Sequence, residues 1–232
     1  MTGSDLTMRC ITLGLCMLIS VSSWAASYEA RYAMRWSVGI TLEADAVERL
    51  TEDGDRHQIE LSAEAGIGSA TETTHLLFDP ETGWTPLDYS YTQSVLGRTT
   101  GRHVRFNWNK GTATRLHEPD TAELVIPAGT LDPLGFRLEL AHRLRTEQPL
   151  PAQITMLDGN DLKTHQLKRH GSEMIETPAG SFRALKFSLE DDAPSADRSF
   201  FFWLAPELDY QLVKLDKRDK KRRLALTLTS YQ

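Results

Sequence analysis

The chain has 232 residues, a formal net charge of −6 and 40% hydrophobic residues. This length suits one large domain with a sizeable core. The mildly acidic balance argues against a nucleic-acid partner, and against binding to an anionic membrane through bulk charge.

Residues 1–25 are predicted to be a secretory signal peptide. Arg9 precedes an apolar run over residues 10–21, and small residues then lead to a cleavage site. The run is shorter than the roughly 20 apolar residues that a membrane-spanning helix needs. We expect cleavage after Ala25, with Ala26 as the alternative, and a periplasmic mature chain.

Residues before Met8 fit a signal peptide poorly, so Met8 is an alternative initiator to Met1. Cys10 and Cys16 both lie in the predicted signal. Leu15 is too bulky to precede a lipid-bearing cysteine, and we therefore expect no lipid anchor. The mature chain, residues 26–232, then has no cysteine and no disulfide, and its own core must hold the fold.

From Tyr28 onward, short alternating runs predict antiparallel strands. In residues 57–65, for example, Ile59, Leu61 and Ala63 share one face and polar side chains share the other. The other predicted strands cover residues 28–38, 41–50, 71–78, 84–95, 103–108, 112–117, 122–126, 153–157, 162–170, 173–176, 183–190, 198–204, 210–217 and 222–231.

One helix is predicted over residues 132–145. Asp132 is a good N-cap and Pro133 suits the first helical position. Leu134, Leu138 and Ala141 then form an apolar stripe. We therefore predict a single all-β, mainly antiparallel domain over residues 26–232. About a dozen or more strands would form a large curled sheet, an open barrel or a sandwich, and the helix would cover or plug one end.

Motifs for catalysis, metals and cofactors are not found in the sequence. His165 and His170 are five residues apart in a predicted strand, which places them on opposite faces. No glycine-rich phosphate loop or nucleophile elbow is present. We expect no catalytic residue, no metal and no cofactor. A hydrolase stays open as a third hypothesis, and its candidate carboxylates are Asp191, Asp192, Asp197, Glu207 and Asp209.

The aromatic block Phe200–Trp203 has two interpretations. It is a strand buried on both faces, or a strand with one face in the core and the other lining a cavity. A curled sheet of this size can enclose an apolar ligand. The candidate ligand-binding residues are Tyr89, Tyr91, Phe106, Trp108, Phe201 and Trp203.

A basic run over residues 214–223 also has two interpretations. It predicts a charged hairpin tip that contacts an anionic glycan or a lipid headgroup, or one that merely protects a sheet edge.

Four segments resemble a secreted proteobacterial family called domain of unknown function 3108. They are Tyr28–Tyr32, Gly129–Leu134, Glu176–Phe182 and Trp203–Tyr210. The chain departs from the family wording at Asp209, where glycine is usual. The resemblance implies a periplasmic, mostly antiparallel β protein, and it brings no catalytic residue.

Our first functional hypothesis is an envelope protein that binds an apolar or amphiphilic ligand, such as a lipid, or a partner, without catalysis. The alternative is a structural or interaction module that contacts an envelope protein or glycan through an edge strand or the basic hairpin. A nucleic-acid partner and a transmembrane segment in the mature chain are not expected.

Overall fold

The computed structural model describes residues 27–117, 120–159, 161–191 and 197–232. The predicted signal peptide, its two cysteines and the possible start at Met8 lie outside these residues. The strands are β1 (Tyr28–Val38), β2 (Ile40–Asp53), β3 (Arg56–Ala65), β4 (Gly68–Asp79), β5 (Gly83–Val95), β6 (Arg98–Asn107), β7 (Thr112–His117), β8 (Asp120–Val125), β9 (Gln153–Leu157), β10 (Leu162–Thr177), β11 (Gly180–Asp191), β12 (Arg198–Ala205), β13 (Gln211–Asp219) and β14 (Arg222–Tyr231).

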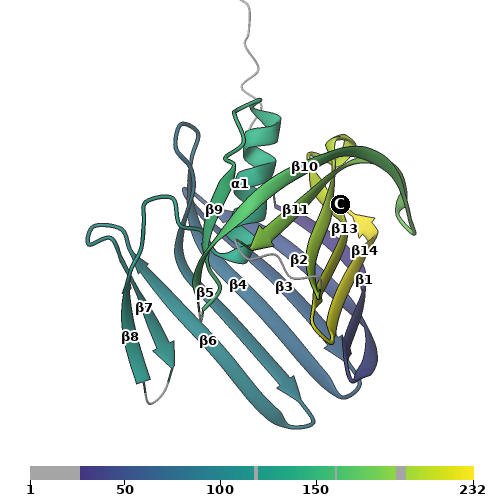
Figure 1. Ribbon diagram of the computed structural model, residues 1–232, viewed down its shortest axis with the longest axis horizontal. Helices are drawn as coiled ribbons and strands as arrows, with labels where there is room; N and C mark the ends of the chain where they lie inside the picture. Colours follow the sequence, from purple (N-terminus) through teal and green to yellow (C-terminus); the bar gives the residue numbers. More distant parts are fainter. Residues whose placement is uncertain (1–26, 118–119, 160, 192–196) are drawn as a thin grey trace, which may run out of the picture.

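All 14 strands belong to one antiparallel sheet with the order β8-β7-β6-β5-β4-β3-β2-β1-β14-β13-β12-β11-β10-β9. The sheet curls, so that β9 and β10 pass over the β4–β5 region in Figure 1. It does not close, because β8 and β9 are its two outer strands. The predicted all-β fold, a large curled antiparallel sheet, is confirmed.

The two halves of the sheet meet where the first strand pairs with the last. In this seam, Met34 of β1 lies opposite Leu226 of β14. Strands β1–β8 follow on one side in chain order, and β14–β9 follow on the other in reverse order. The seam therefore joins segments from opposite ends of the chain into one continuous wall.

The single α-helix of the described residues is α1 (Pro133–Arg145), as predicted. Asp132 caps it, because its Oδ1 accepts hydrogen bonds from the backbone N–H groups of Leu134 (3.0 Å) and Gly135 (2.9 Å). The Thr74 hydroxyl of β4 donates to the same oxygen at 2.7 Å. This cap fixes the start of the helix against the inner face of the sheet.

The helix lies inside the curl and is buried on two sides. Leu134 and Leu138 pack in one cluster with residues of β2–β5, including Leu76. Phe136 and Leu140 pack in another cluster with residues of the β10–β14 half. The helix therefore fills the space between the two halves of the sheet instead of capping an open face.

One strand prediction needs correction. Residues 162–170 and 173–176 were expected as separate strands, but β10 runs continuously from Leu162 to Thr177. Its register against β11 shifts between Arg169 and Ser172, and Gly171 there has φ +92°. The glycine marks a β-bulge, which bends a strand without ending it.

The turn between β12 and β13 explains the departure at Asp209. A short 3-10 helix, η1 (Pro206–Leu208), is followed by Asp209 with φ +53°. This left-handed conformation favours glycine, and aspartate is among the residues that tolerate it best. The chain therefore keeps the turn geometry with a different residue.

Candidate functional site

A cavity of about 550 Å³ lies inside the curl. Its walls come from β3–β6 of one half of the sheet, from α1, and from β9–β14 of the other half. Figure 1 shows why these elements meet: β10 crosses over the first half of the sheet while α1 stands between them. The cavity therefore exists because the sheet curls around the helix without closing on it.

The part of the cavity next to α1 is apolar. Its lining residues come from the helix and from the middle of strands, and most are buried. They include Phe136, Met156, Phe202, Leu215, Leu224 and Leu226. The Phe202 ring lies edge-on to Phe136 of the helix, with 5.9 Å between ring centroids. An aromatic and aliphatic floor of this kind can hold an apolar chain.

A polar pair, the buried Tyr89 and the half-buried Glu72, interrupts the apolar wall on β4 and β5. The Tyr89 hydroxyl donates a hydrogen bond to Glu72 Oε1 at 2.8 Å. Burial raises the pKa of Glu72, while the hydrogen bond from Tyr89 opposes this change. Burial and the nearby Glu72 carboxylate likewise raise the pKa of Tyr89. The pair places a hydrogen-bonding group deep in the cavity.

Three cations, Arg102, Lys217 and Arg218, line the cavity without an ion-pair partner among the described residues, and the first two lie over aromatic rings. Arg102 of β6 lies with its guanidinium carbon 5.4 Å from the centroid of the Tyr91 ring. Lys217 of β13 lies with Nζ 5.1 Å from the centroid of the Phe200 ring. Arg102 also donates a long hydrogen bond from Nη1 to the Asp158 carbonyl (3.5 Å), and neither Arg102 nor Lys217 is bound to a carboxylate.

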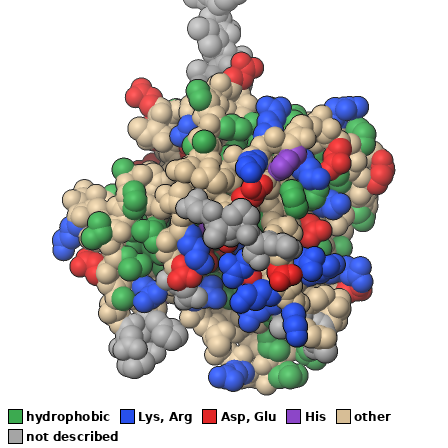
Figure 2. All heavy atoms as spheres, viewed as in Figure 1, with side chains coloured by type: hydrophobic (Ala, Val, Ile, Leu, Met, Phe, Trp, Pro, Cys, Tyr) green, Lys and Arg blue, Asp and Glu red, His purple; other side chains and the backbone are tan. Residues whose placement is uncertain are grey.

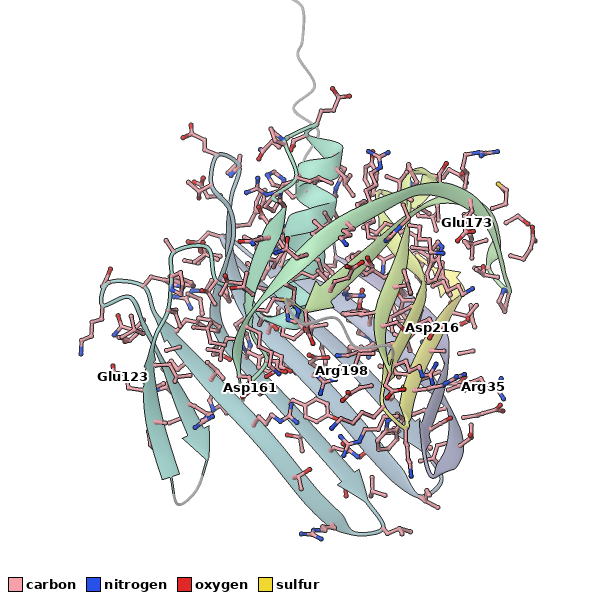
Figure 3. All side chains as sticks on the ribbon, in the orientation of Figure 1. Arg35, Glu123, Asp161, Glu173, Arg198 and Asp216 are labelled. Carbon is pink, nitrogen blue, oxygen red and sulfur yellow. The ribbon has the colours of Figure 1, made fainter. Side chains whose placement is uncertain are left out.

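Ion pairs surround the end of the cavity formed by strand termini. Asp191, the last residue of β11, lies 2.9 Å from His165 Nδ1 and 3.4 Å from Arg198 Nη1. Arg198 Nε also lies 2.9 Å from Asp219, the last residue of β13. Figure 3 shows Arg198 and Asp161 near the centre of the molecule, between the two halves of the sheet. This end of the cavity is therefore polar and charged.

The wall between β11 and β12 is split at the polar end. These strands pair only where Leu185–Ser188 lies opposite Phe201–Leu204. Beyond that point β11 continues along β10, and β12 continues along β13. The unpaired ends, residues 189–191 and 198–200, all line the cavity. The cavity thus reaches into a fork in the sheet.

A buried polar network lies behind the apolar floor. Glu48 of β2 is fully buried, and its Oε1 accepts hydrogen bonds from the Tyr28 hydroxyl (2.8 Å) and Gln211 Nε2 (3.0 Å). Its other oxygen pairs with Arg137 of α1. Burial alone would lower the pKa of Arg137, but Glu48, Tyr32 and other neighbours raise it instead. The network ties the helix to both halves of the sheet.

Arg137 separates the main cavity from a second one of about 360 Å³, because it lines both. The second cavity is also lined by Arg145, Asp209 and Tyr231. The hydrogen bonds around Glu48 are made within the protein, so this cavity is walled by a polar network that is already satisfied.

The structure places the six predicted binding residues in two groups. Tyr89, Tyr91 and Phe201 line the main cavity. Phe106, Trp108 and Trp203 are not among its lining residues. The prediction of one shared cavity therefore applies to the first three alone.

The second group is engaged in packing. Phe106 and Trp108 stack with ring centroids 5.6 Å apart, and the Trp108 indole N–H donates to the Pro86 carbonyl at 2.6 Å. Trp203 Nε1 donates to Glu173 Oε1 at 2.5 Å. Lys186 and Lys214 lie over the Trp203 ring, with Nζ 5.1 and 4.7 Å from its centroid. Glu173 lies out along β10 in Figure 3, away from the cavity.

The carboxylates of the hydrolase hypothesis do not gather in one place. Asp191 lines the main cavity and Asp209 the second one. Glu207 accepts a hydrogen bond from the Arg183 backbone N–H at 3.2 Å. Asp197 is exposed, and Asp192 lies outside the described residues. No two of the described members line the same cavity.

Sequence reasoning missed the polar residues of the site, although two left a signal. Glu48 occupies an inward position of an alternating strand, on the face of Ala46 and Leu50. Arg137 lies within the apolar helix stripe of Leu134 and Leu138. A charged residue at an apolar position of a periodic pattern indicates a buried partner.

Across the described ranges, no group of three His, Cys, Asp or Glu side chains is arranged to hold a metal ion. The same residues contain no helix with the length and hydropathy to cross a bilayer, and α1 has 13 residues.

A comparison with models of known protein families tests the resemblance to domain of unknown function 3108. The model of the family described as "Protein of unknown function (DUF3108)" matches residues 27–227. The chain belongs to the DUF3108 family. The resemblance drawn from the four sequence segments is therefore confirmed. The comparison with curated proteins gives no match.

Solved structures similar to this DUF3108 protein show the same kind of fold. A beta-barrel-like protein of the domain of unknown function DUF1849 from Brucella abortus has a TM-score of 0.57 at 11% identity. The match covers 89% of this chain and 97% of that chain. At this identity the likeness shows the fold alone.

Two further structures have low scores. A protein described as exported, with a YmcC-like fold, from Bacteroides fragilis NCTC 9343 has a TM-score of 0.30 at 10% identity, covering 88% of this chain and 95% of that chain. A protein described as a lipoprotein from Parabacteroides distasonis ATCC 8503 has a TM-score of 0.31 at 10% identity, covering 89% and 94%.

Proposed function

We propose that this DUF3108 protein binds an amphiphilic ligand with an anionic headgroup inside its curled sheet, without catalysis. The observation that carries the proposal is the division of the 550 Å³ cavity into an apolar part beside α1 and a charged part at the strand ends. This division matches a molecule with one apolar and one polar end.

The apolar part supports burial of a hydrocarbon chain. Side chains that face open space, such as Leu224 and Leu226, lack van der Waals contacts on that side. A bound hydrocarbon chain would supply these contacts. Each buried methylene contributes about 0.8 kcal/mol. A chain of a few methylenes would therefore supply several kcal/mol of binding free energy before the cost of ordering the ligand.

The charged part supports recognition of an anion. Arg102 and Lys217 approach the cavity from opposite halves of the sheet, on β6 and β13. Neither forms an ion pair with a described carboxylate, so an anionic headgroup would meet cations that no carboxylate contacts directly. Tyr91 and Phe200, on which they rest, would direct them toward the ligand.

The proposed place of action is the periplasm, and it rests on the signal-peptide pattern of residues 1–25. Mass spectrometry of the protein recovered from the periplasm would find an N-terminus at Ala26 or Ser27. An intact N-terminal segment on the folded protein would contradict this location.

Native mass spectrometry of the protein, purified from its own cells without detergent, tests the binding function. We expect an added mass that organic extraction releases as an anionic amphiphile. Protein that carries no added mass, and that takes up none from a mixture of fatty acids and phospholipids, would refute the proposal.

Matched variants on β14 locate the ligand. Leu224→Trp projects a large ring into the cavity that Leu224 lines, and it should abolish the added mass. Ala225→Trp is the control, because successive residues of a strand face opposite sides and Ala225 is not a lining residue. Equal loss in both variants would show that the ligand does not occupy the cavity.

A further inference from the structure

Neighbouring hairpin tips at the two ends of the sheet differ in charge. In an antiparallel meander, alternate turns lie at the same end of the sheet. The turns β1–β2, β3–β4, β5–β6 and β13–β14 therefore share one end, along the lower margin of Figure 1. The turns β2–β3, β4–β5, β6–β7 and β12–β13 share the other end.

The second end is acidic. Its turns expose six carboxylates against two cations, Arg56 and Lys110. The carboxylates are Asp53, Asp55, Asp79, Glu81, Glu207 and Asp209. Figure 2 shows acidic side chains at the upper margin of the molecule, which is this end. It would be repelled by an anionic surface.

The first end, which we call the docking rim, exposes two large apolar side chains at neighbouring tips. Leu96 of the β5–β6 tip is 78% exposed, and Ile67 of the β3–β4 tip is 39% exposed. The Leu96 backbone N–H donates to the Ile67 carbonyl at 2.9 Å, which holds the two tips together. Leu96 also has φ +50°, an unfavourable conformation for leucine.

The docking rim is also basic. Lys220, Lys221, Arg222 and Arg223 form the β13–β14 tip, and all four are exposed. None forms an ion pair with another described residue, whereas the acidic residue of this tip, Asp219, pairs with Arg198. The next tip is adjacent, because Val38 pairs with Arg222. Basic side chains predominate in the lower part of the face in Figure 2.

We infer that the docking rim binds the surface of an anionic phospholipid membrane. Exposed apolar side chains on rigid tips can enter the boundary between headgroups and acyl chains, and nearby lysine and arginine residues are attracted to anionic headgroups. Six exposed carboxylates lie on the four turns listed for the far end, whereas four exposed cations form the β13–β14 tip, where the exposed Asp197 is the nearest acidic neighbour. The exposed cations and the two apolar tips therefore turn the docking rim toward the membrane.

The docking rim lies beside the charged end of the cavity. Asp219 belongs both to the cavity lining and to the start of the basic tip. The Lys220 backbone N–H donates to the Asp197 carbonyl at 2.8 Å, next to the forked ends of β11 and β12. A membrane on the docking rim would therefore face the polar end of the cavity, although the membrane binding itself does not depend on a cavity ligand.

Vesicle flotation of the mature protein, residues 26–232, tests the inference. The probes are vesicles of phosphatidylcholine alone and of phosphatidylcholine mixed with phosphatidylglycerol, each at low and high salt. We expect binding to the mixed vesicles at low salt, weak binding to the neutral vesicles, and release by salt. Protein that stays in solution with the anionic vesicles at low salt would refute the inference.

Two variants of the docking rim measure separately what the basic tip and the apolar tips contribute to vesicle binding. Lys220→Asn with Lys221→Gln removes two charges and should weaken partitioning about 25-fold, at about fivefold for each basic residue near an anionic surface. Ile67→Ser with Leu96→Asn should weaken binding to the same vesicles by about tenfold or more. Asparagine suits Lys220 and Leu96, because both have a left-handed backbone conformation.

Control variants carry the same changes away from the docking rim. Lys110→Gln removes a cation at the acidic end, and Val125→Ser removes an apolar side chain that is 81% exposed on the outer strand β8. Both should partition like the unmodified protein. Loss of binding in the controls, or unchanged binding in both rim variants, would overturn the assignment. So would a dimer in solution that the rim variants dissociate, because the docking rim would then bind a second copy.

Discussion

Removing the Arg137 guanidinium should destabilise the protein strongly, because the fully buried Glu48 carboxylate would lose its cation. In Arg137→Met the side chain keeps similar bulk, and Glu48 keeps only the hydrogen bonds from Tyr28 and Gln211. Breaking a buried pair on one side costs about 3 to 5 kcal/mol. Because Glu48 keeps two hydrogen-bond donors, we expect a loss of stability at the lower value, about 3 kcal/mol. For a chain of this size this corresponds to a fall of about 10 °C in Tm.

Thermal and urea unfolding of ligand-free protein measure this effect. Arg35→Met is the matched control, since the Arg35–Glu43 pair has side chains that are 68% and 71% exposed. An exposed pair of this kind contributes about 0 to 1 kcal/mol. A double-mutant cycle with Glu48→Gln should also show coupling of about 2 kcal/mol. A Tm for Arg137→Met within error of the control would refute the reasoning about the buried network.

Three further predictions concern the helix cap, the half-buried Glu72 and the packed Trp108. Asp132→Ala should lower the free energy of unfolding by about 2 kcal/mol, because three buried donors lose their acceptor. In the same urea titration, Asp132→Asn should lower it by less than half of that amount. Burial raises the pKa of Glu72, so the stability from this group is present below its unfolded pKa and is lost as pH rises through the folded pKa. Compared with Glu72→Gln, the unmodified protein should therefore be relatively more stable at pH 4 than at pH 7, and an equal difference in Tm at both pH values would contradict the raised pKa. Trp108→Phe loses the hydrogen bond to the Pro86 carbonyl and should cost about 1 kcal/mol of stability, with the affinity for an amphiphile unchanged.

Most of the fold could be predicted from local patterns in the sequence. The alternation in residues 57–65 and the Asp132–Pro133 start of the helix depend on neighbouring residues, and the sequence displays these directly. The seam between β1 and β14 pairs Met34 with Leu226, and no local pattern encodes a pairing over that separation. The curl that places α1 between the two halves follows from this seam. The sequence could therefore predict that a curled sheet encloses a cavity, but not which elements form its walls.

The candidate site was harder to predict for the same reason. Alternation places Phe200 and Phe202 on one face and Phe201 and Trp203 on the other, but it does not say which face meets the helix. Phe202 contacts Phe136, whereas Trp203 is covered by Lys186, Lys214 and Glu173. Phe106 and Trp108 share a face as predicted, yet they stack on each other and fill space. Aromatic composition therefore indicated a ligand site without distinguishing lining from packing.

Titration of the protein with a fluorescent long-chain fatty acid tests the central claim most directly. The measurement compares the unmodified protein with Leu224→Trp, Ala225→Trp and the double variant Arg102→Gln with Lys217→Gln. We predict saturable one-site binding that Leu224→Trp abolishes, that the double variant weakens about tenfold or more through the loss of two charge-assisted contacts, and that Ala225→Trp leaves intact. Absence of saturable binding, or equal affinity in all four proteins, would contradict an amphiphile site inside the curled sheet.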